Sequence, residues 1–510
     1  MIPKRDVIIA PYLKKERMSI MAGQTKQSEF NKVLTAKDML VIAFGAMIGW
    51  GWVVSTGDWI GRGGAVGAAL GFAIGGIMIF FVGMTYAELT AALPQCGGEH
   101  VFSYKAMGPT GSFICTWGIV FGYVGVVCFE ACAFPTIVGY LFPGFLKGYL
   151  YTVAGFDIYA SWLAVAIVVA ILMTWINIIG VKTAANVQTV FTVVIIAVGL
   201  AIIGVSAARG DIENILPQMW NGDSTGSIVK SVIRVAVTTP FFFIGFDVIP
   251  QAAEEIKGSL KKIGFYLILS VVMAVVFYGC VILAVGYSLN PQEIAEGMKG
   301  NGLITADVLV KAFNSKALGN VVIIGGLCGI VTSWNSFMIG GSRAMYSMAD
   351  SYMIPAAFAK LHPKYKTPIN ALLLIGAISM AAPFAGRQML VWISDAGNLG
   401  CCLAYCMVSA SFLILRKKAP DMPRPYKVKH YKFFGWMAVL LSGGMVACYI
   451  IPGSGSTLVW QEWCMAGAWT LIGVIFYFRE KKKYGEKFGL HTDIEIEYTE
   501  EDLAAINANK

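Results

Sequence analysis

Two glycine-rich stretches decide the fold. They read Ala43-Phe44-Gly45-Ala46-Met47-Ile48-Gly49-Trp50-Gly51-Trp52 and Thr239-Pro240-Phe241-Phe242-Phe243-Ile244-Gly245-Phe246-Asp247. Each interrupts a long apolar run, where glycine lowers the cost of leaving helical geometry and proline removes a backbone donor. Inside a bilayer, backbone groups freed in this way are tolerated only where they line a cavity or meet a ligand. The two stretches therefore predict helices that are broken within a membrane.

The composition supports a membrane setting for the whole chain. Of its 510 residues, 57% are hydrophobic and only 14% are charged, whereas soluble domains carry about 25% charged residues. This balance excludes soluble, disordered and collagen-like classes. The eleven cysteines are scattered and only four histidines occur, so no metal site and no cofactor is expected. The sequence predicts an all-α integral membrane protein.

Apolar runs of the length that crosses a bilayer, about 20 residues, predict 12 transmembrane helices. They lie at 38–61, 64–92, 111–142, 159–180, 185–208, 229–255, 263–287, 319–348, 368–386, 389–415, 434–452 and 457–478. Most of the 39 Lys and Arg residues fall in the two tails and in the loops on the same side. The positive-inside rule then places both termini in the cytoplasm, and this topology accounts for the basic excess without a nucleic-acid partner.

The two glycine-rich stretches lie in the first and sixth of these runs. An offset of five helices means that the two broken helices cross the membrane in opposite directions. That relationship is typical of a 5+5 inverted repeat, which holds its substrate between discontinuous helices near the bilayer midplane. A single glycine cluster could equally mark an ordinary helix contact, so the matching positions of the pair carry the inference.

Four features of the sequence resemble one known family, the amino acid–polyamine–organocation (APC) superfamily of transporters. They are the glycine motif Gly45–Gly51, the stretch Tyr86–His100, the stretch Ser342–Pro368, and Arg416-Lys417-Lys418 followed by Arg424-Pro425-Tyr426. The resemblance implies a LeuT-like fold and a multi-pass protein of the cell membrane. It implies a cytoplasmic tail (1–36), an inverted-repeat transport core (37–416), helices 11 and 12 (417–480) and an acidic cytoplasmic tail (481–510).

The resemblance also implies where a small amino acid or organic amine would bind. In related transporters, exposed backbone of the two broken helices receives the carboxylate and the amine of the substrate. Carried over by position, the substrate-binding residues are Ala46, Met47, Ile48, Gly49, Trp50, Gly51, Phe243, Ile244, Gly245, Phe246 and Asp247. Many members have a small residue at the place of Trp50, so an indole there either gates the pocket or fills space that a carboxylate needs.

Glu130 is a carboxylate in the middle of the third apolar run. A charge at this depth costs several kcal/mol unless it is paired, so it is a functional hypothesis by default. It matches the position at which the related arginine–agmatine antiporter holds the cationic end of its substrate. We expect it to pair with a substrate ammonium; a protonated packing residue and a proton-coupling site are the alternatives.

The remaining candidates concern gating and coupling. Asp247 is either a gating or proton-sensing group or a structural acceptor, and aromatic side chains are expected to close the site. The aromatic candidates are Phe243, Phe246, Trp334, Phe337 and Tyr405. Protons or sodium are open as coupling ions: Ile195 replaces a lysine found in some proton-coupled members, and Thr332 and Ser333 could offer hydroxyls to sodium, although such hydroxyls usually bond their own backbone.

The predicted function is secondary active transport by alternating access. An enzyme is not expected because no His, Asp or Cys cluster has catalytic spacing, and an amine-binding sensor is a weaker alternative. Within transport, an amine with a weak carboxylate requirement competes with a zwitterionic amino acid whose carrier uses Glu130 and Asp247 for protons. The substrate and the lipid bilayer are the expected partners. The acidic segment His491–Lys510 is either a solvated tail or a regulatory latch.

Overall fold

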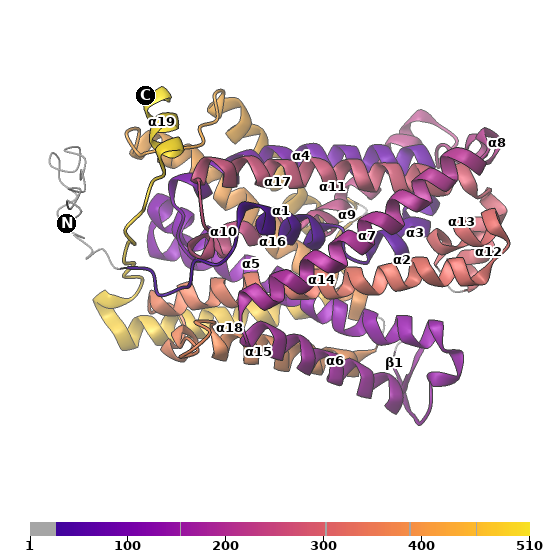
Figure 1. The fold of residues 1–510 in the computed structure, drawn as a ribbon, viewed down its shortest axis with the longest axis horizontal. Helices are drawn as coiled ribbons and strands as arrows, with labels where there is room; N and C mark the ends of the chain where they lie inside the picture. Colours follow the sequence, from indigo (N-terminus) through magenta and orange to yellow (C-terminus); the bar gives the residue numbers. More distant parts are fainter. Residues whose placement is uncertain (1–26, 154, 301–302, 387–388, 455, 510) are drawn as a thin grey trace, which may run out of the picture.

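The computed structural model describes residues 27–153, 155–300, 303–386, 389–454 and 456–509. Most long helices run side by side along the longest axis of the molecule (Figure 1). The start of α1 (Ala36–Met47) and the C-terminal helix α19 (Glu500–Ala508) lie at one end, which we call the terminal end (Figure 1). Of the N-terminal tail predicted at 1–36, residues 1–26 lie outside the described part.

The helices follow the chain in the order in which the apolar runs were predicted. After α1 come α2 (Gly51–Val54), α3 (Thr56–Gly63), α4 (Ala65–Ala92), α5 (Glu99–Leu141), α6 (Ala160–Ile178), α7 (Val181–Arg209), α8 (Ile212–Ile215), α9 (Thr225–Phe243), α10 (Val248–Gln251) and α11 (Leu260–Ser288). Then follow α12 (Pro291–Gly300), α13 (Ile304–Phe313), α14 (Lys316–Asp350), α15 (Ile369–Ala381), α16 (Met389–Lys418), α17 (Tyr431–Ile450), α18 (Trp460–Tyr484) and α19. Strands β1 (Tyr149–Val153) and β2 (Phe156–Tyr159) pair antiparallel.

Ten helical stretches in the described residues are long and apolar enough to cross a membrane. The prediction of an all-helical membrane protein is therefore confirmed. The ninth predicted span corresponds to the shorter apolar helix Ile369–Ala385, and the twelfth to α18, which ends in a run of lysines at 481–483. These two are not among the ten, so the number twelve stays a prediction.

The structure adds elements that hydropathy did not predict. The third run was predicted to begin at 111, but α5 begins at Glu99 and turns at Gly108, whose φ is +78°. Gly108 tolerates this conformation, and Pro109 lacks the N–H that a continuous helix would use. The β1–β2 hairpin and helices α8, α12 and α13 gather at the end opposite the terminal end (Figure 1).

Small residues let the central helices approach closely. A methyl group added at Gly118 of α5 would lie 3.0 Å from the carbonyl oxygen of Gly400 on α16, and one added at Gly125 would lie 3.2 Å from that of Ile393. Helices in lipid associate largely through such close backbone packing. Large apolar side chains face outward elsewhere, as at Leu440, which is 64% exposed, and this surface fits a lipid environment.

Buried ion pairs join the sequence motifs at the terminal end. Glu88 of α4 accepts hydrogen bonds from Arg416 (2.5 Å) and Arg424 (3.0 Å). Arg343 of α14 pairs with Glu255 at 2.8 Å, and both side chains are buried. These contacts explain why the charged residues of the motifs tolerate burial: each charge has an opposite partner and further hydrogen bonds.

Candidate functional site

The first broken helix leaves polar backbone unpaired inside the bundle. Helix α1 ends at Met47 and α2 begins at Gly51. In the described part of the chain, the N–H groups of Gly49, Trp50 and Gly51 make no hydrogen bond. The freed carbonyl of Gly45 accepts a hydrogen bond from the Thr332 hydroxyl at 2.9 Å. The break therefore exposes donors toward the interior, while one freed acceptor is satisfied by α14.

The second break is shaped by its own aspartate. Helix α9 ends at Phe243 and α10 begins at Val248, with Gly245 at φ +140° between them. The Gly245 N–H donates to Oδ1 of Asp247 at 2.8 Å. The Tyr405 hydroxyl donates to Oδ2 at 3.0 Å. Both carboxylate oxygens are therefore engaged in holding the turn, as expected for a structural acceptor.

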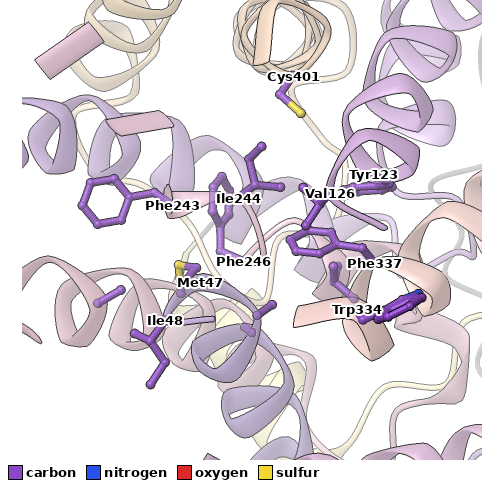
Figure 2. Packing of buried hydrophobic residues seen from close by; sticks show 14 of the residues in the cluster. Met47, Ile48, Tyr123, Val126, Phe243, Ile244, Phe246, Trp334, Phe337 and Cys401 are labelled. Atoms are coloured by element: carbon purple, nitrogen blue, oxygen red, sulfur yellow. The ribbon is translucent and has the colours of Figure 1, made fainter. Parts of the chain in front are cut away.

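The two breaks touch each other in the middle of the bundle. A methyl group added at Gly245 would lie 2.6 Å from Cβ of Ala46 and 3.0 Å from the backbone nitrogen of Met47. Met47 and Ile48 lie close to Phe243, Ile244 and Phe246 in this region (Figure 2). The expected juxtaposition of two discontinuous helices is thus present, and glycine at 245 is what allows the contact.

Glu130 lies beside the first break with one free oxygen. Its carboxylate is 3% exposed, and Oε1 accepts a hydrogen bond from the Ser333 hydroxyl at 2.5 Å. The other oxygen, Oε2, is buried and has no partner among the described residues. A methyl group added at Gly49 would lie 3.5 Å from Oε1. A buried carboxylate oxygen without a donor fits a site that receives a cation or a proton from a ligand.

The predicted aromatic residues surround the two breaks. Phe246 packs between Tyr86 and Tyr405: its ring centroid lies 5.2 Å from that of Tyr86 and 5.4 Å from that of Tyr405. Phe337 packs against Tyr123 at 5.7 Å. Figure 2 shows Phe246 and Phe337 lying close together, with Trp334 on the same side as Phe337. The Trp334 side chain is fully buried and its indole N–H has no hydrogen-bond partner in the described residues.

Trp50 points toward α14. Its six-membered ring occupies the position that a side chain at Gly326 would take. The neighbouring Gly49 carbonyl packs in the same way against Gly329. Trp50 also contributes to the wall of an apolar cavity of about 320 Å³, together with Phe129, Phe156 and Trp162. The two expectations for this indole, a gate and a ring that fills space needed by a carboxylate, both stay predictions.

Sequence reasoning missed two groups of contacts. Ser333 was considered only as a sodium ligand, whereas its hydroxyl donates to Glu130; its place on the same run as Trp334 was the available signal. The second group lies between α7 and α14, where the Gln188 amide donates to Ser336 at 3.0 Å and accepts from Asn335 at 3.1 Å. This neutral network joins α7 to α14.

All fifteen predicted site residues are buried. They come from α1, α2, α5, α9, α14 and α16 and from the two breaks. No three His, Cys, Asp or Glu side chains group in a way that could hold a metal ion within the ranges that the structure describes. Two broken helices that touch inside a helical bundle, with a buried carboxylate beside the first break, are typical of carriers for small polar solutes.

Comparison with known proteins identifies the family. A family model described as amino acid permease matches residues 34–476, and the chain therefore belongs to the amino acid permease family of the APC superfamily. The branched-chain amino acid permease BcaP of Bacillus subtilis is 25% identical over 484 residues, which cover 93% of this chain and 98% of the relative. The methylthioribose transporter of the same organism is 25% identical over 478 residues (92% and 98%).

A third relative carries a coupling ion in its name. The aspartate-proton symporter of Bacillus subtilis is 24% identical over 430 residues, covering 83% of this chain and 80% of the relative. Together with the family match, these relatives confirm the resemblance drawn from the four sequence features. The chain is an amino acid transporter and a multi-pass membrane protein, and the prediction of a transporter in place of an enzyme is confirmed.

Proposed function

We propose that this transporter carries a small amino acid or organic amine across the cell membrane by alternating access, with Glu130 pairing with the substrate ammonium. The observation that carries the proposal is the free, buried Oε2 of Glu130 beside two breaks that touch. An ammonium is a donor that would satisfy this oxygen with a charge-assisted hydrogen bond. The wider architecture belongs to the proposal: 12 membrane helices in a 5+5 inverted repeat, with both termini cytoplasmic.

The unpaired N–H groups at 49–51 supply the complementary half of the site. A substrate carboxylate would accept hydrogen bonds from these backbone donors, as anions do at exposed helix ends. The Trp50 ring lies on the side of α14, against Gly326. This geometry favours an α-amino acid over an amine that lacks the carboxylate.

Proton coupling is the second candidate role of the same residue. Glu130 would then take up a proton on Oε2 while the substrate is held by backbone alone, with Asp247 as the other carboxylate near the breaks. One relative of this chain is named as a proton symporter, which favours keeping this alternative. The two roles differ in what the residue binds, and they share the same position.

A ligand screen tests the substrate class. We expect the purified protein to gain thermal stability with amino acids and to gain less with the matching decarboxylated amines, because only the former use both halves of the site. A ligand at 100 times its dissociation constant stabilises the folded state by about 2.7 kcal/mol, which a thermal-shift assay resolves. Equal shifts for each acid and its amine would contradict a carboxylate site at 49–51.

A further inference from the structure

Two glycines of α14 form a notch that receives the first break. The Trp50 ring lies where a side chain at Gly326 would be, and the Gly49 carbonyl lies where one at Gly329 would be. Trp50 is 3% exposed, so the notch buries the indole almost completely. A large ring that packs against a backbone without side chains has a well-defined position. A methyl group added to either glycine would displace it.

Trp50 lies next to two different environments. One is the Glu130 carboxylate: a methyl group added at the neighbouring Gly49 would lie 3.5 Å from its Oε1. The other is the 320 Å³ apolar cavity, whose wall includes Trp50 but does not include Glu130. This cavity is bounded by Phe156 of β2 and Trp162 of α6, and β1 and β2 lie at the end opposite the terminal end (Figure 1).

We infer that the Trp50 indole is a gate between the apolar cavity and the Glu130 site, and that Gly326 is the positioning residue that forms its closed seat. This inference rests on the proposed function, because it concerns access to the same site. Rotation of the indole out of the notch joins the cavity to the space beside Glu130. Since most residues that line the cavity are apolar or aromatic, Phe129, Phe156 and Trp162 among them, the cavity suits substrates with an apolar or aromatic side chain.

A double-mutant cycle tests the seat. We expect Gly326→Ala to lower transport of an apolar amino acid at least tenfold, because the methyl group displaces the ring. In a Trp50→Ala background the same substitution should change transport less than twofold, since no ring remains to be displaced. Gly279→Ala is the matched control, because a methyl group at Gly279 meets nothing within 4 Å. A Gly326→Ala effect of equal size in both backgrounds overturns the inference.

Thiol labelling separates this inference from the proposed function. In Ser333→Cys protein, we expect a small thiol reagent to label position 333 at least tenfold faster when Trp50 is also replaced by Ala, as followed by site-resolved mass spectrometry. This readout needs no substrate. Unchanged labelling overturns the gate even if amino acids bind, and faster labelling supports the gate even if no tested amino acid binds.

A second feature, at the terminal end, leads to an independent inference. Residues 485–509, which we call the C-terminal clasp, pair with three separate elements. Asp493 pairs with Lys105 of α5 at 2.6 Å, Glu497 with Lys32 before α1 at 2.7 Å, and Glu501 with Lys262 of α11 at 2.8 Å. Exposed pairs of this kind contribute little each, so the position of the clasp needs a stronger anchor.

Asp502 supplies that anchor by capping a membrane helix. Its Oδ1 accepts hydrogen bonds from the Ser259 hydroxyl (2.8 Å) and from the Lys261 N–H (3.0 Å) in the first turn of α11. Its Oδ2 accepts from Thr499 in a capping box that begins α19. Asp502 is fully buried. A carboxylate at a helix N-terminus accepts hydrogen bonds from free N–H groups and interacts favourably with the positive end of the helix dipole.

The clasp also packs into the terminal end near Phe488. The Phe488 side chain is 8% exposed and packs against Tyr477 of α18. The Gly489 N–H donates to the Ser351 carbonyl, just after α14, at 2.8 Å. The Gln95 amide donates to the Thr492 carbonyl at 3.5 Å. One segment thus connects α11, α14, α18 and the loop between α4 and α5.

The charge of Asp502 is stable at physiological pH. Burial raises its pKa, but hydrogen bonds from Lys261, Thr499 and Ser259 outweigh burial and bring the pKa below the ordinary 3.8. A carboxyl whose pKa is lowered by folding stabilises the docked state above its ordinary pKa and loses this effect as the pH falls through the lowered value. The Asp502 contacts therefore hold through neutral and mildly acidic pH.

The geometry points to a lock: the C-terminal clasp holds the terminal end closed, and it has to detach from α11 before that end can open. Alternating access requires the helices at each end to separate in turn. The clasp spans the helix ends that would separate, including the segment that leads into α1. Of the two alternatives that the sequence left open for this segment, these contacts favour a regulatory latch over a solvated tail.

Crosslinking tests the lock directly. In a Lys262→Cys, Glu501→Cys variant, a short cleavable thiol crosslinker joins the clasp to α11 without removing any other contact. We expect crosslinked protein in proteoliposomes to lose at least tenfold in amino acid transport and to recover after reduction, which shows that the fold is intact. Glu501→Cys alone is the control for reagent effects. Transport at the uncrosslinked rate overturns the lock.

A labelling experiment tests release without any substrate. Cys96 is 5% exposed and follows Gln95, which contacts the clasp. We expect a thiol reagent to modify Cys96 at least tenfold faster in Asp502→Ala protein, and less so in Asp502→Asn, which keeps one acceptor oxygen. Site-resolved mass spectrometry separates Cys96 from the other cysteines. An unchanged rate in Asp502→Ala overturns the inference.

Discussion

Glu130→Gln is expected to lower the affinity for an ammonium-bearing substrate about 100-fold. The substitution keeps the size of the side chain and its contact with Ser333 but removes the negative charge. Losing one member of a buried charge pair costs about 2–5 kcal/mol, and each 1.4 kcal/mol corresponds to a factor of ten in affinity. Calorimetric or thermal-shift titration of purified wild-type and variant protein measures the difference.

Two companion variants give this result its meaning. Ser333→Ala removes the 2.5 Å hydrogen bond to Oε1 but leaves the charge, so we expect a loss of only about tenfold, since a hydrogen bond to a charged group contributes about 1.5–3 kcal/mol at most. Glu462→Gln changes another buried carboxylate, on α18, which accepts a hydrogen bond from the Val459 N–H; it should leave affinity unchanged.

The alternative role predicts a different pattern for Glu130→Gln. If Glu130 carries protons and backbone alone holds the substrate, the variant keeps its affinity and its substrate exchange. It then loses only the uptake that a proton gradient drives. Wild-type affinity in the variant therefore contradicts ammonium pairing and favours proton coupling, and the comparison of exchange with gradient-driven uptake in the same liposomes decides between them.

The sequence predicted the broken helices because their cause is local. Glycines at 45, 49, 51 and 245 and the proline at 240 lower the cost of leaving the helix within an apolar run, and both effects can be read from single residues. The helical breaks are at 48–50 and 244–247, inside the predicted stretches. The prediction that the two breaks meet came from the expected inverted repeat, which itself stays a prediction.

The seat of Trp50 could not be predicted in the same way. It depends on which glycines of α14 face the first break, and the 319–348 run contains several glycines with similar neighbours. Only the packing of α1 and α2 against α14 selects Gly326 and Gly329. The sequence therefore identified Trp50 as unusual, whereas the direction in which its side chain points depends on how the helices pack.

For the segment of the C-terminal clasp, the sequence left a solvated tail and a regulatory latch open for a related reason. An acidic segment without apolar periodicity is equally consistent with a solvated tail. What fixes it is a buried cap on a helix that begins about 240 residues earlier, with Asp502 bound to Ser259 and Lys261. Contacts between such distant residues leave no local signal in one sequence.

Glu88→Ala is expected to cause the largest loss of stability of any single substitution considered. Glu88 is 1% exposed and is bonded to two guanidinium groups, those of Arg416 and Arg424, and to the Val428 N–H at 2.7 Å. Both arginines are held in place, Arg424 by backbone carbonyls and Arg416 over the Tyr431 ring at 4.8 Å. Without Glu88, two buried positive charges face each other, and breaking a buried pair costs about 3–5 kcal/mol.

The net charge of the cluster sets the order of effects expected in a thermal unfolding series in detergent. With one carboxylate and two guanidinium groups, the cluster is stabilised by Glu88 more than by either arginine. Arg416→Met leaves a neutral Glu88–Arg424 pair and keeps most of the apolar stem, so it should lower the melting temperature less than Glu88→Ala or Glu88→Gln. Glu497→Gln, which removes a largely exposed pair with Lys32, should have no measurable effect. A Glu88→Gln protein that melts at the wild-type temperature would mean that the two arginines are solvated and that the cluster does not hold α4 to the segment after α16.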